Sequence, residues 1–303
     1  MKRIVILLLA LLLALSCFAC ATVEQPEQPE QPEQPEQPEQ PDQPEQPEQP
    51  EQPEQPEQPK QEEPKEMKIR IGSYNIANGR DVGHDMSLLA KDIVDQNLDI
   101  VGLQEVDRLA SRSKFIDTLK ELSDLTGYEY YYYAKAIDLA GDKATYGQDG
   151  EYGIGILSKH PIMDEDCYKL DSQGREQRML AYAKIKINGK MINFFTSHLS
   201  FEADNIRKSQ LAEIEDYVSM YTNAFLTADF NLRSIEELAV LSEMSPVSTV
   251  EDPIISYRGT DWNTQSIDNI CYTTDDFEVV DAYAVDNHHS DHFLLVAEFV
   301  VKE

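Results

Sequence analysis

Cysteine is scarce in this sequence. Of its 303 residues only four are cysteine, and Cys17 and Cys20 lie in an apolar segment at the N-terminus. The other two, Cys167 and Cys271, are too few to indicate a disulfide framework. Cys271 lies in an apolar strand pattern, which predicts a buried packing residue rather than a metal ligand or a bridge partner.

Basic residues are also few. The chain has 26 Lys and Arg against 56 Asp and Glu, a formal net charge of -30, and residues 67–303 alone carry -19. A domain this acidic repels polyanions, which weighs against DNA or RNA as a routine substrate unless a local basic rim exists.

Long apolar runs are limited to one, Ile4 to Leu15, which follows two basic residues. This pattern is typical of an export signal and is too short for a convincing membrane span. Ala19 and Ala21 fit a small-x-small cleavage site, whereas Cys17 or Cys20 would suit lipidation. We expect an exported protein of the cell surface or periplasm, anchored as a lipoprotein, with secretion as the alternative.

The next segment is a repeat. Glu24 to Pro59 repeats Glu-Gln-Pro with one change, at Asp42. Proline at every third position favours polyproline II, and at about 3.1 Å per residue the segment would reach on the order of 110 Å. The predicted organisation is therefore a signal at 1–21, a linker at 22–66 and one globular, monomeric domain at 67–303. A proline-rich ligand for a partner is the less favoured interpretation, because flanking basic and apolar anchors are missing.

The domain alternates strand and helix patterns and then becomes rich in strands, an order that two face-to-face sheets with helices outside would satisfy. Asn188-Gly189 predicts a hairpin turn. Helices are predicted at Met86 to Gln96, Phe115 to Thr126 and Ala203 to Met220. Strands are predicted at Met67 to Ile76, Leu98 to Leu103, Tyr128 to Lys135, Gly153 to Ser158, Met179 to Ile187, Met191 to Ser197 and Ala224 to Thr227, with three more to follow.

Short polar segments follow several of these strands. Because such groups meet at one edge of a sheet, we expect them to form a site. Their carboxylate and amide oxygens suit Mg²⁺ or Mn²⁺, while two histidines without a third His or Cys fit zinc poorly. The segments are SYN (Ser73 to Asn75), LQE (Leu103 to Glu105), TSHL (Thr196 to Leu199), TADFN (Thr227 to Asn231), SIDNI (Ser266 to Ile270) and SDHF (Ser290 to Phe293).

The order of these segments, with YGIGILS (Tyr152 to Ser158) among them, resembles that of the endonuclease/exonuclease/phosphatase superfamily. The resemblance covers nearly all of Met67 to Val301. It implies an α/β (α+β) fold, a four-layer α-β-β-α sandwich of two mixed sheets flanked by helices. The segments QEVDR (Gln104 to Arg108), YYAKAID (Tyr132 to Asp138) and GREQRMLAYAKI (Gly174 to Ile185) look most like the bacterial metal-dependent hydrolase branch.

The resemblance also implies a divalent-metal site. Glu105 would be the principal ligand with Asn75 beside it, and Asp291 would bind or position a second metal. A metal is needed because phosphodiesters are anionic and their nucleophile is water.

Catalytic roles follow from the same resemblance. Asp229 would activate the water and Asn231 would orient the water or the phosphate. His292 would lie near the scissile phosphate with Asp268 on its other ring nitrogen, and His198 would bond a phosphate oxygen. Whether Asp229 or His292 is the general base stays open.

Glu176 and Arg178 are expected to lie on one strand face and hold the phosphate or a ligand, with an ordinary cross-strand ion pair as the alternative. Three positions depart from common family patterns: Ala228, Asn269 and Ile154. The departures at Asn269 and Ile154 concern expected contacts with the substrate. The residues expected to bind the metal and to activate the water are present.

These observations predict an exported Mg²⁺- or Mn²⁺-dependent phosphoesterase that hydrolyses phosphodiester bonds, with small molecules or lipid head groups as favoured substrates. A secreted or surface nuclease is the alternative enzyme. A non-catalytic surface binding module is the alternative of another class; it would be indicated by loss of Glu105, Asp229 or His292, and all three are present.

Overall fold

A computed structural model describes residues 66–141, 149–259 and 265–302 of the chain. The predicted signal at 1–21 lies outside the described residues, as does the predicted linker at 22–66 apart from Glu66. Within the described part, no helix has both the length and the apolar character needed to cross a membrane.

The domain contains two mixed sheets of six strands each. The first sheet has the order β11-β12-β1-β2-β4-β3, with bounds Phe277–Val285, Leu294–Val301, Lys68–Asn75, Ile100–Arg108, Gly150–Ser158 and Tyr130–Leu139. The second has the order β5-β6-β7-β8-β10-β9, with bounds Ile162–Leu170, Arg178–Ile187, Lys190–His198, Ala224–Asp229, Asp268–Thr273 and Met244–Pro246. The α-helices are α1 (Met86–Asp95), α2 (Thr118–Thr126) and α3 (Asp204–Val218), and the 3-10 segments are η1 (Ala77–Val82), η2 (Ser111–Ser113) and η4 (Ile235–Val240).

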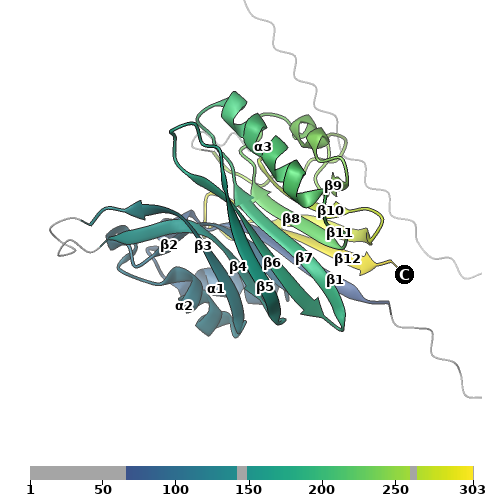
Figure 1. The fold of residues 1–303 in the computed structure, drawn as a ribbon. Coiled ribbons are helices and arrows are strands. Elements are labelled where there is room, and N and C mark those ends of the chain that lie inside the picture. Colours follow the sequence, from purple (N-terminus) through teal and green to yellow (C-terminus); the bar gives the residue numbers. More distant parts are fainter. Residues whose placement is uncertain (1–65, 142–148, 260–264, 303) are drawn as a thin grey trace, which may run out of the picture. The chain divides into compact units, whose positions relative to one another are not determined.

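Three buried clusters define four layers. The central cluster joins residues of both sheets, such as Ile71 and Phe194. Leu89 of α1 and Leu122 of α2 pack on the first sheet, and Leu211 of α3 packs on the second. Figure 1 shows α3 on one side of the paired sheets and α1 and α2 on the other. The predicted four-layer α-β-β-α sandwich is therefore confirmed.

Local signals explain several element boundaries. The helix predicted from Phe115 begins only at Thr118, because the Asp117 side chain caps it by accepting from the Lys120 amide, and it ends at Gly127 with φ 73°. The hairpin between β6 and β7 turns at Asn188 and Gly189, both at positive φ as a tight primed turn requires.

Two strands were not predicted: β5, and one of the four strands that follow β8, where three were expected. Strand β5 has the largely polar sequence IMDEDCYKL, and four consecutive residues, Met163 to Asp166, are exposed. It lies at the edge of the second sheet and pairs with β6 alone. An edge strand with little to bury carries no strong alternation of apolar residues, which explains why the sequence pattern missed it.

The two sheets approach each other closely at Gly102 of β2. A Cβ there would lie 2.1 Å from Thr227 Oγ1 and 2.5 Å from Thr196 Oγ1. Gln104 Nε2 donates to Thr196 Oγ1 at 3.0 Å, which links the sheets just below the strand ends that carry the site.

Candidate active site

The predicted site residues gather at one edge of the paired sheets. Strands β7 and β8 are parallel, so His198 and Asp229 end on the same side of the second sheet. Asn75, at the end of β1 in the first sheet, contacts Asp229 and therefore lies on that side too. Strand β10 runs antiparallel to β8 and therefore begins there, with Asp268 opposite Asp229. A cavity of ≈ 660 Å³ opens at this edge. Eight of the ten predicted residues line it: Glu105, Glu176, Arg178, His198, Asp229, Asn231, Asp291 and His292.

Glu105 reaches the cavity through a break in the sheet. The register between β2 and β4 shifts between Leu103 and Val106, and Glu105 has φ 56°. A bulge of this kind re-aims a side chain, and a positive φ at a non-glycine residue costs free energy; both features are common at functional sites.

Asn75 lies behind the cavity and connects two carboxylates. Its Nδ2 donates to Asp229 Oδ2 at 2.9 Å and to Glu105 Oε1 at 3.3 Å, while its Oδ1 accepts from the Ala77 amide at 3.0 Å. In this orientation Asn75 positions both acids and offers a metal only the second lone pair of Oδ1.

His292 stands between two aspartates. Its Nδ1 lies 2.9 Å from Asp268 Oδ2, which also accepts from Ser256 Oγ, and its Nε2 lies 3.7 Å from Asp229 Oδ2. Burial lowers the pKa of His292, but the charges of Asp268 and Asp229 outweigh that effect and raise it to about 10. Burial, reinforced by the charge of Asp268, raises the pKa of Asp229 to about 7. At neutral pH the histidine is thus the charged group, and Asp229 is poised to exchange a proton.

His198 has the opposite character. Burial and then the positive charges of Arg178 and His292 hold its pKa well below the ordinary value, so it is neutral. Its Nε2 is 3.3 Å from Asp229 Oδ2 and its buried Nδ1 has no protein partner. A neutral imidazole in this position can donate one hydrogen bond without adding charge.

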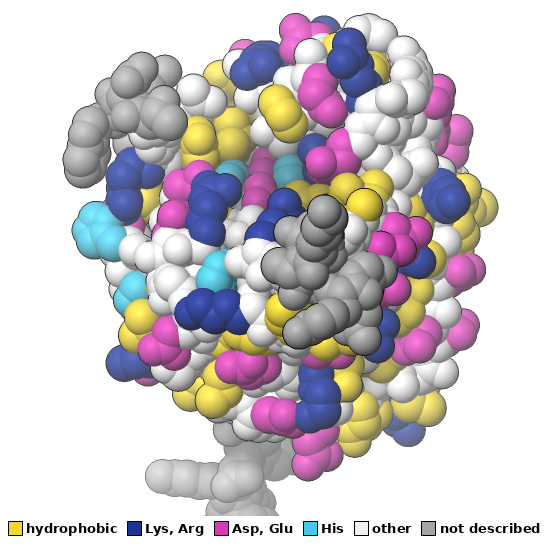
Figure 2. Space-filling view, turned by 90° about the vertical axis from the view of Figure 1, so that its left-hand side faces the viewer, with side chains coloured by type: hydrophobic (Ala, Val, Ile, Leu, Met, Phe, Trp, Pro, Cys, Tyr) yellow, Lys and Arg dark blue, Asp and Glu magenta, His cyan; other side chains and the backbone are white. Residues whose placement is uncertain are grey.

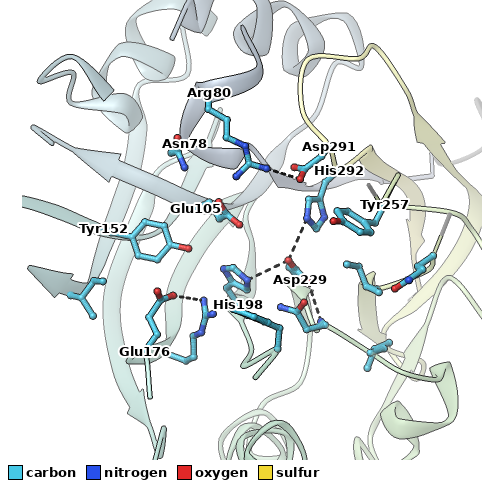
Figure 3. Close-up of a pocket in the computed structure, with 18 of the residues that line it drawn as sticks. Asn78, Arg80, Glu105, Tyr152, Glu176, His198, Asp229, Tyr257, Asp291 and His292 are labelled. Atoms are coloured by element: carbon cyan, nitrogen blue, oxygen red, sulfur yellow. Dashed lines mark hydrogen bonds and ion pairs between the residues drawn. The ribbon is translucent and has the colours of Figure 1, made fainter. Parts of the chain in front are cut away.

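The predicted pair Glu176 and Arg178 lies on the wall beside β4 and β6. Arg178 begins β6, but Glu176 lies in the bend before that strand, so the two do not share a strand face as predicted. Arg178 Nη1 bonds Glu176 Oε1 at 3.0 Å, so the ion pair exists and both residues also line the cavity. The Tyr152 hydroxyl points into the cavity toward Glu105 (Figure 3), and burial raises its pKa, which keeps it protonated.

Asn231 and Asp291 complete the predicted set. The backbone N–H of Asn231 donates to Asp229 Oδ1 at 3.0 Å, and the side-chain Nδ2 of Asn231 donates to the carbonyl oxygen of Leu199. Asp291 is bonded through Oδ2 to Arg80, and its buried Oδ1 has no partner.

Several residues of the cavity were not predicted from the sequence. Asn78 and Arg80 belong to η1, shortly after SYN. The Asn-Gly pair in this segment predicts a turn, but it does not predict that the turn brings these side chains to the cavity. The Tyr257 ring lies 4.7 Å from the His292 ring and comes from a segment without a regular strand pattern. On the face shown in Figure 2, histidine and acidic side chains lie in a depression with basic side chains beside it, although the domain as a whole is acidic.

Two groups of donors fit a divalent ion. Glu105, Asn75 Oδ1 and the partnerless Asp291 Oδ1 offer oxygens of the kind that Mg²⁺ and Mn²⁺ prefer. Ligand atoms of Asp229, Asp268 and His292 also lie within 4.8 Å of one another. In that second group His292 Nδ1 and Asp268 Oδ2 are hydrogen-bonded to each other, so an ion bound there would have to break this hydrogen bond.

Several solved structures share the fold of this chain. The structure is similar to an endonuclease/exonuclease/phosphatase from Beutenbergia cavernae (TM-score 0.62, 20% identity, 77% of this chain and 72% of that one). It is similar to a mannosyl-6-phosphatase from Bacteroides thetaiotaomicron (TM-score 0.56, 20% identity, 77% of this chain and 99% of that one) and to the catalytic domain of human Nocturnin with bound sulfate (TM-score 0.59, 18% identity, 78% of this chain and 94% of that one). These likenesses show the fold.

Among curated proteins, none matches the sequence. The sequence pattern of one family matches residues 72–292, which spans every residue of the site from Asn75 to His292. The chain belongs to the Endonuclease/Exonuclease/phosphatase family.

Proposed function

We propose that this chain is a divalent-metal-dependent phosphoesterase that hydrolyses phosphodiester bonds by attack of water. The observation that carries the proposal is the pairing of His292 with Asp268 at 2.9 Å, beside Asp229 and at the floor of a cavity lined by Glu105. It supports a mechanism in which a proton acceptor, a fixed cation and a metal ligand act on one substrate.

Asp229 is the residue that accepts the proton of the water. Its pKa of about 7 leaves it partly ionised at neutral pH, close to the value at which a general base works best. His292, with a pKa near 10, is already protonated and cannot accept a proton there. It instead offers positive charge and an N–H group to the phosphoryl oxygen or the leaving group. The choice of base that the sequence left open is thus proposed as Asp229.

Glu105, with Asn75 Oδ1, would hold the divalent ion. When bound, Mg²⁺ or Mn²⁺ would neutralise charge on the phosphoryl oxygens and polarise the bond that breaks. Asn75 fixes Glu105 and Asp229 relative to each other. The neutral His198 would donate to a phosphoryl oxygen through Nε2, which lies 3.3 Å from Asp229 Oδ2.

The remaining wall favours a compact substrate. Tyr152, Tyr257 and the half-exposed Phe201 supply aromatic surface around the cavity, while Glu176 neutralises part of the charge of Arg178. A nucleic acid strand would need a continuous basic track beyond the cavity, whereas the domain carries a net charge of -19. Small phosphodiesters or lipid head groups are therefore the proposed substrates, with nuclease activity as the alternative.

Export and lipid anchoring remain part of the proposal. They are supported by the N-terminal apolar run, by Cys17 and Cys20, and by the Glu-Gln-Pro segment from Glu24 to Pro59. Labelling of the expressed chain with a radioactive fatty acid, lost in Cys17→Ala/Cys20→Ala, is the direct measurement.

The activity test uses the purified chain with Mn²⁺ or Mg²⁺ and three substrates in parallel: bis-p-nitrophenyl phosphate, sphingomyelin vesicles and supercoiled plasmid. We expect phosphodiester hydrolysis that EDTA abolishes and that Asp229→Asn and His292→Asn each reduce by about 10²–10⁴. Plasmid nicking as the fastest reaction would establish the nuclease alternative. No hydrolysis of any phosphodiester by a metal-loaded, folded chain would favour the binding module.

A further inference from the structure

Arg80 lies at the mouth of the cavity and is held against Asp291. Its Nη2 donates to Asp291 Oδ2 at 2.6 Å, and its Nε lies 3.5 Å from Asp81 Oδ1. The other Asp81 oxygen accepts from the backbone N–H of Asp291 at 3.1 Å. The three residues therefore close a ring that fixes the guanidinium beside Asp291, and Figure 3 shows it directed there.

The segment that carries Arg80 is built for this position. Ala77, Asn78 and Gly79 have φ values of 46°, 48° and 74°, three consecutive residues in the left-handed region. Gly79 packs so closely that a Cβ would lie 2.2 Å from Met86 Cε. A run of this kind is unfavourable for Ala and Asn, and such strain is typical of positions retained for function.

Arg80 supplies positive charge where carboxylates converge. The charges of Asp291, Glu105 and Asp81 all act on its guanidinium. In the resemblance described above, Asp291 is the residue that would bind or position a second metal. A second ion on Asp291 would share that carboxylate with Arg80, and two cations on one carboxylate repel each other.

We infer that Arg80 takes the place of a second divalent ion at Asp291, so that the cavity holds one ion at Glu105 and uses Arg80 as its second, fixed cation. The inference rests on the proposed metal-dependent function. It gives Arg80 a defined task, which is to face a non-bridging phosphoryl oxygen from the side opposite His198.

The test is the number of Mn²⁺ ions bound per chain, measured by equilibrium dialysis and by EPR of the bound ions. We expect one ion for the native chain and for Arg80→Lys, which keeps the charge. Arg80→Met and Arg80→Gln are expected to bind two ions whose EPR signals couple. Adding Asp291→Asn to Arg80→Met should return the number to one.

Arg233→Met is the matched control. Arg233 also lines the cavity, but its carboxylate contact is the exposed Asp204 at 3.5 Å, so its loss should leave one ion bound. Two ions in the native chain, or one ion in both Arg80→Met and Arg80→Gln with native-like circular dichroism, would overturn the inference. No bound ion in the native chain would instead overturn the metal-dependent function itself, which separates the two failures.

Discussion

Asn75 bridges the two sheets at the active site: from the end of β1 its Nδ2 donates to Asp229 Oδ2, at the end of β8, across 2.9 Å. The same nitrogen donates to Glu105 Oε1, so one amide sets the spacing between a proposed metal ligand and the proposed general base. Ser290 Oγ in turn donates to the Asn75 carbonyl oxygen at 2.8 Å and accepts from the His292 amide at 3.2 Å, which ties His292 to the same residue.

Replacing Asn75 by Ala should lower kcat/KM by about 10²–10³, the usual cost of losing one positioned donor in an active site. In the native chain the hydrogen bond from Asn75 lowers the pKa of Asp229, so the pKa of Asp229 should be higher in Asn75→Ala. The acid limb of the pH–rate profile should therefore move to higher pH. Asn231→Gly is the control: it keeps the backbone N–H that donates to Asp229 and accepts the φ of 51°, so the limb should stay in place. An acid limb that stays in place in Asn75→Ala as well would contradict the bridge.

The pH profile of the native enzyme should be bell-shaped. Asp229 must be ionised to accept a proton, so activity falls as pH drops through about 7, and His292 must stay protonated, so activity falls as pH rises through about 10. Asp268 raises both pKa values through its negative charge, and Asp268→Asn should therefore move both limbs to lower pH by about one unit, besides reducing the rate. Ser256→Ala, which removes a hydrogen bond to Asp268 but no charge, should leave both limbs in place. Limbs that move in opposite directions in Asp268→Asn would show that these residues do not set the profile.

A divalent ion should stabilise the fold through Glu105. At a hundredfold excess over Kd a ligand adds about 2.7 kcal/mol to the free energy of unfolding, which corresponds to roughly 5–10 °C in Tm for a domain of this size. Glu105→Gln should abolish the rise in Tm on adding Mn²⁺, while Glu176→Gln, which alters a paired carboxylate on the other wall, should retain it. A rise that survives Glu105→Gln and disappears in Asp268→Asn would place the ion at the Asp229, Asp268 and His292 group instead.

Gly102 should be required for the close approach of the sheets. A methyl group there would collide with Thr227 Oγ1 and Thr196 Oγ1, and overpacking of this kind costs about 1–3 kcal/mol. Gly102→Ala should reduce the urea midpoint accordingly. Gly155→Ala is the matched control, because its new Cβ meets only the flexible end of the Leu119 side chain at 3.0 Å. The urea midpoint of Gly155→Ala should therefore decrease less. Equal decreases in the urea midpoint for the two variants would contradict the requirement for glycine at position 102.

Much of the site could be predicted from the sequence because its residues follow strands. Asn75, His198 and Asp229 each end an apolar run, and the ends of parallel strands meet by topology. The order of the motifs then indicated the family, and the match over residues 72–292 confirms it. The strand patterns likewise predicted the two sheets. They missed β5, because an exposed edge strand leaves no periodic apolar signal, and they gave three strands after β8 where the structure has four.

The sequence by itself thus determined the family, the four layers and the identity of the central acids and histidines, since these depend on local periodicity and on the order of motifs. Only the tertiary structure decided what surrounds them. The bulge that turns Glu105 inward, the entry of Arg80 from η1 and the placing of Tyr257 against His292 depend on contacts between segments up to 211 residues apart. Such contacts arise from the packing of two sheets, and no local pattern in the chain encodes them.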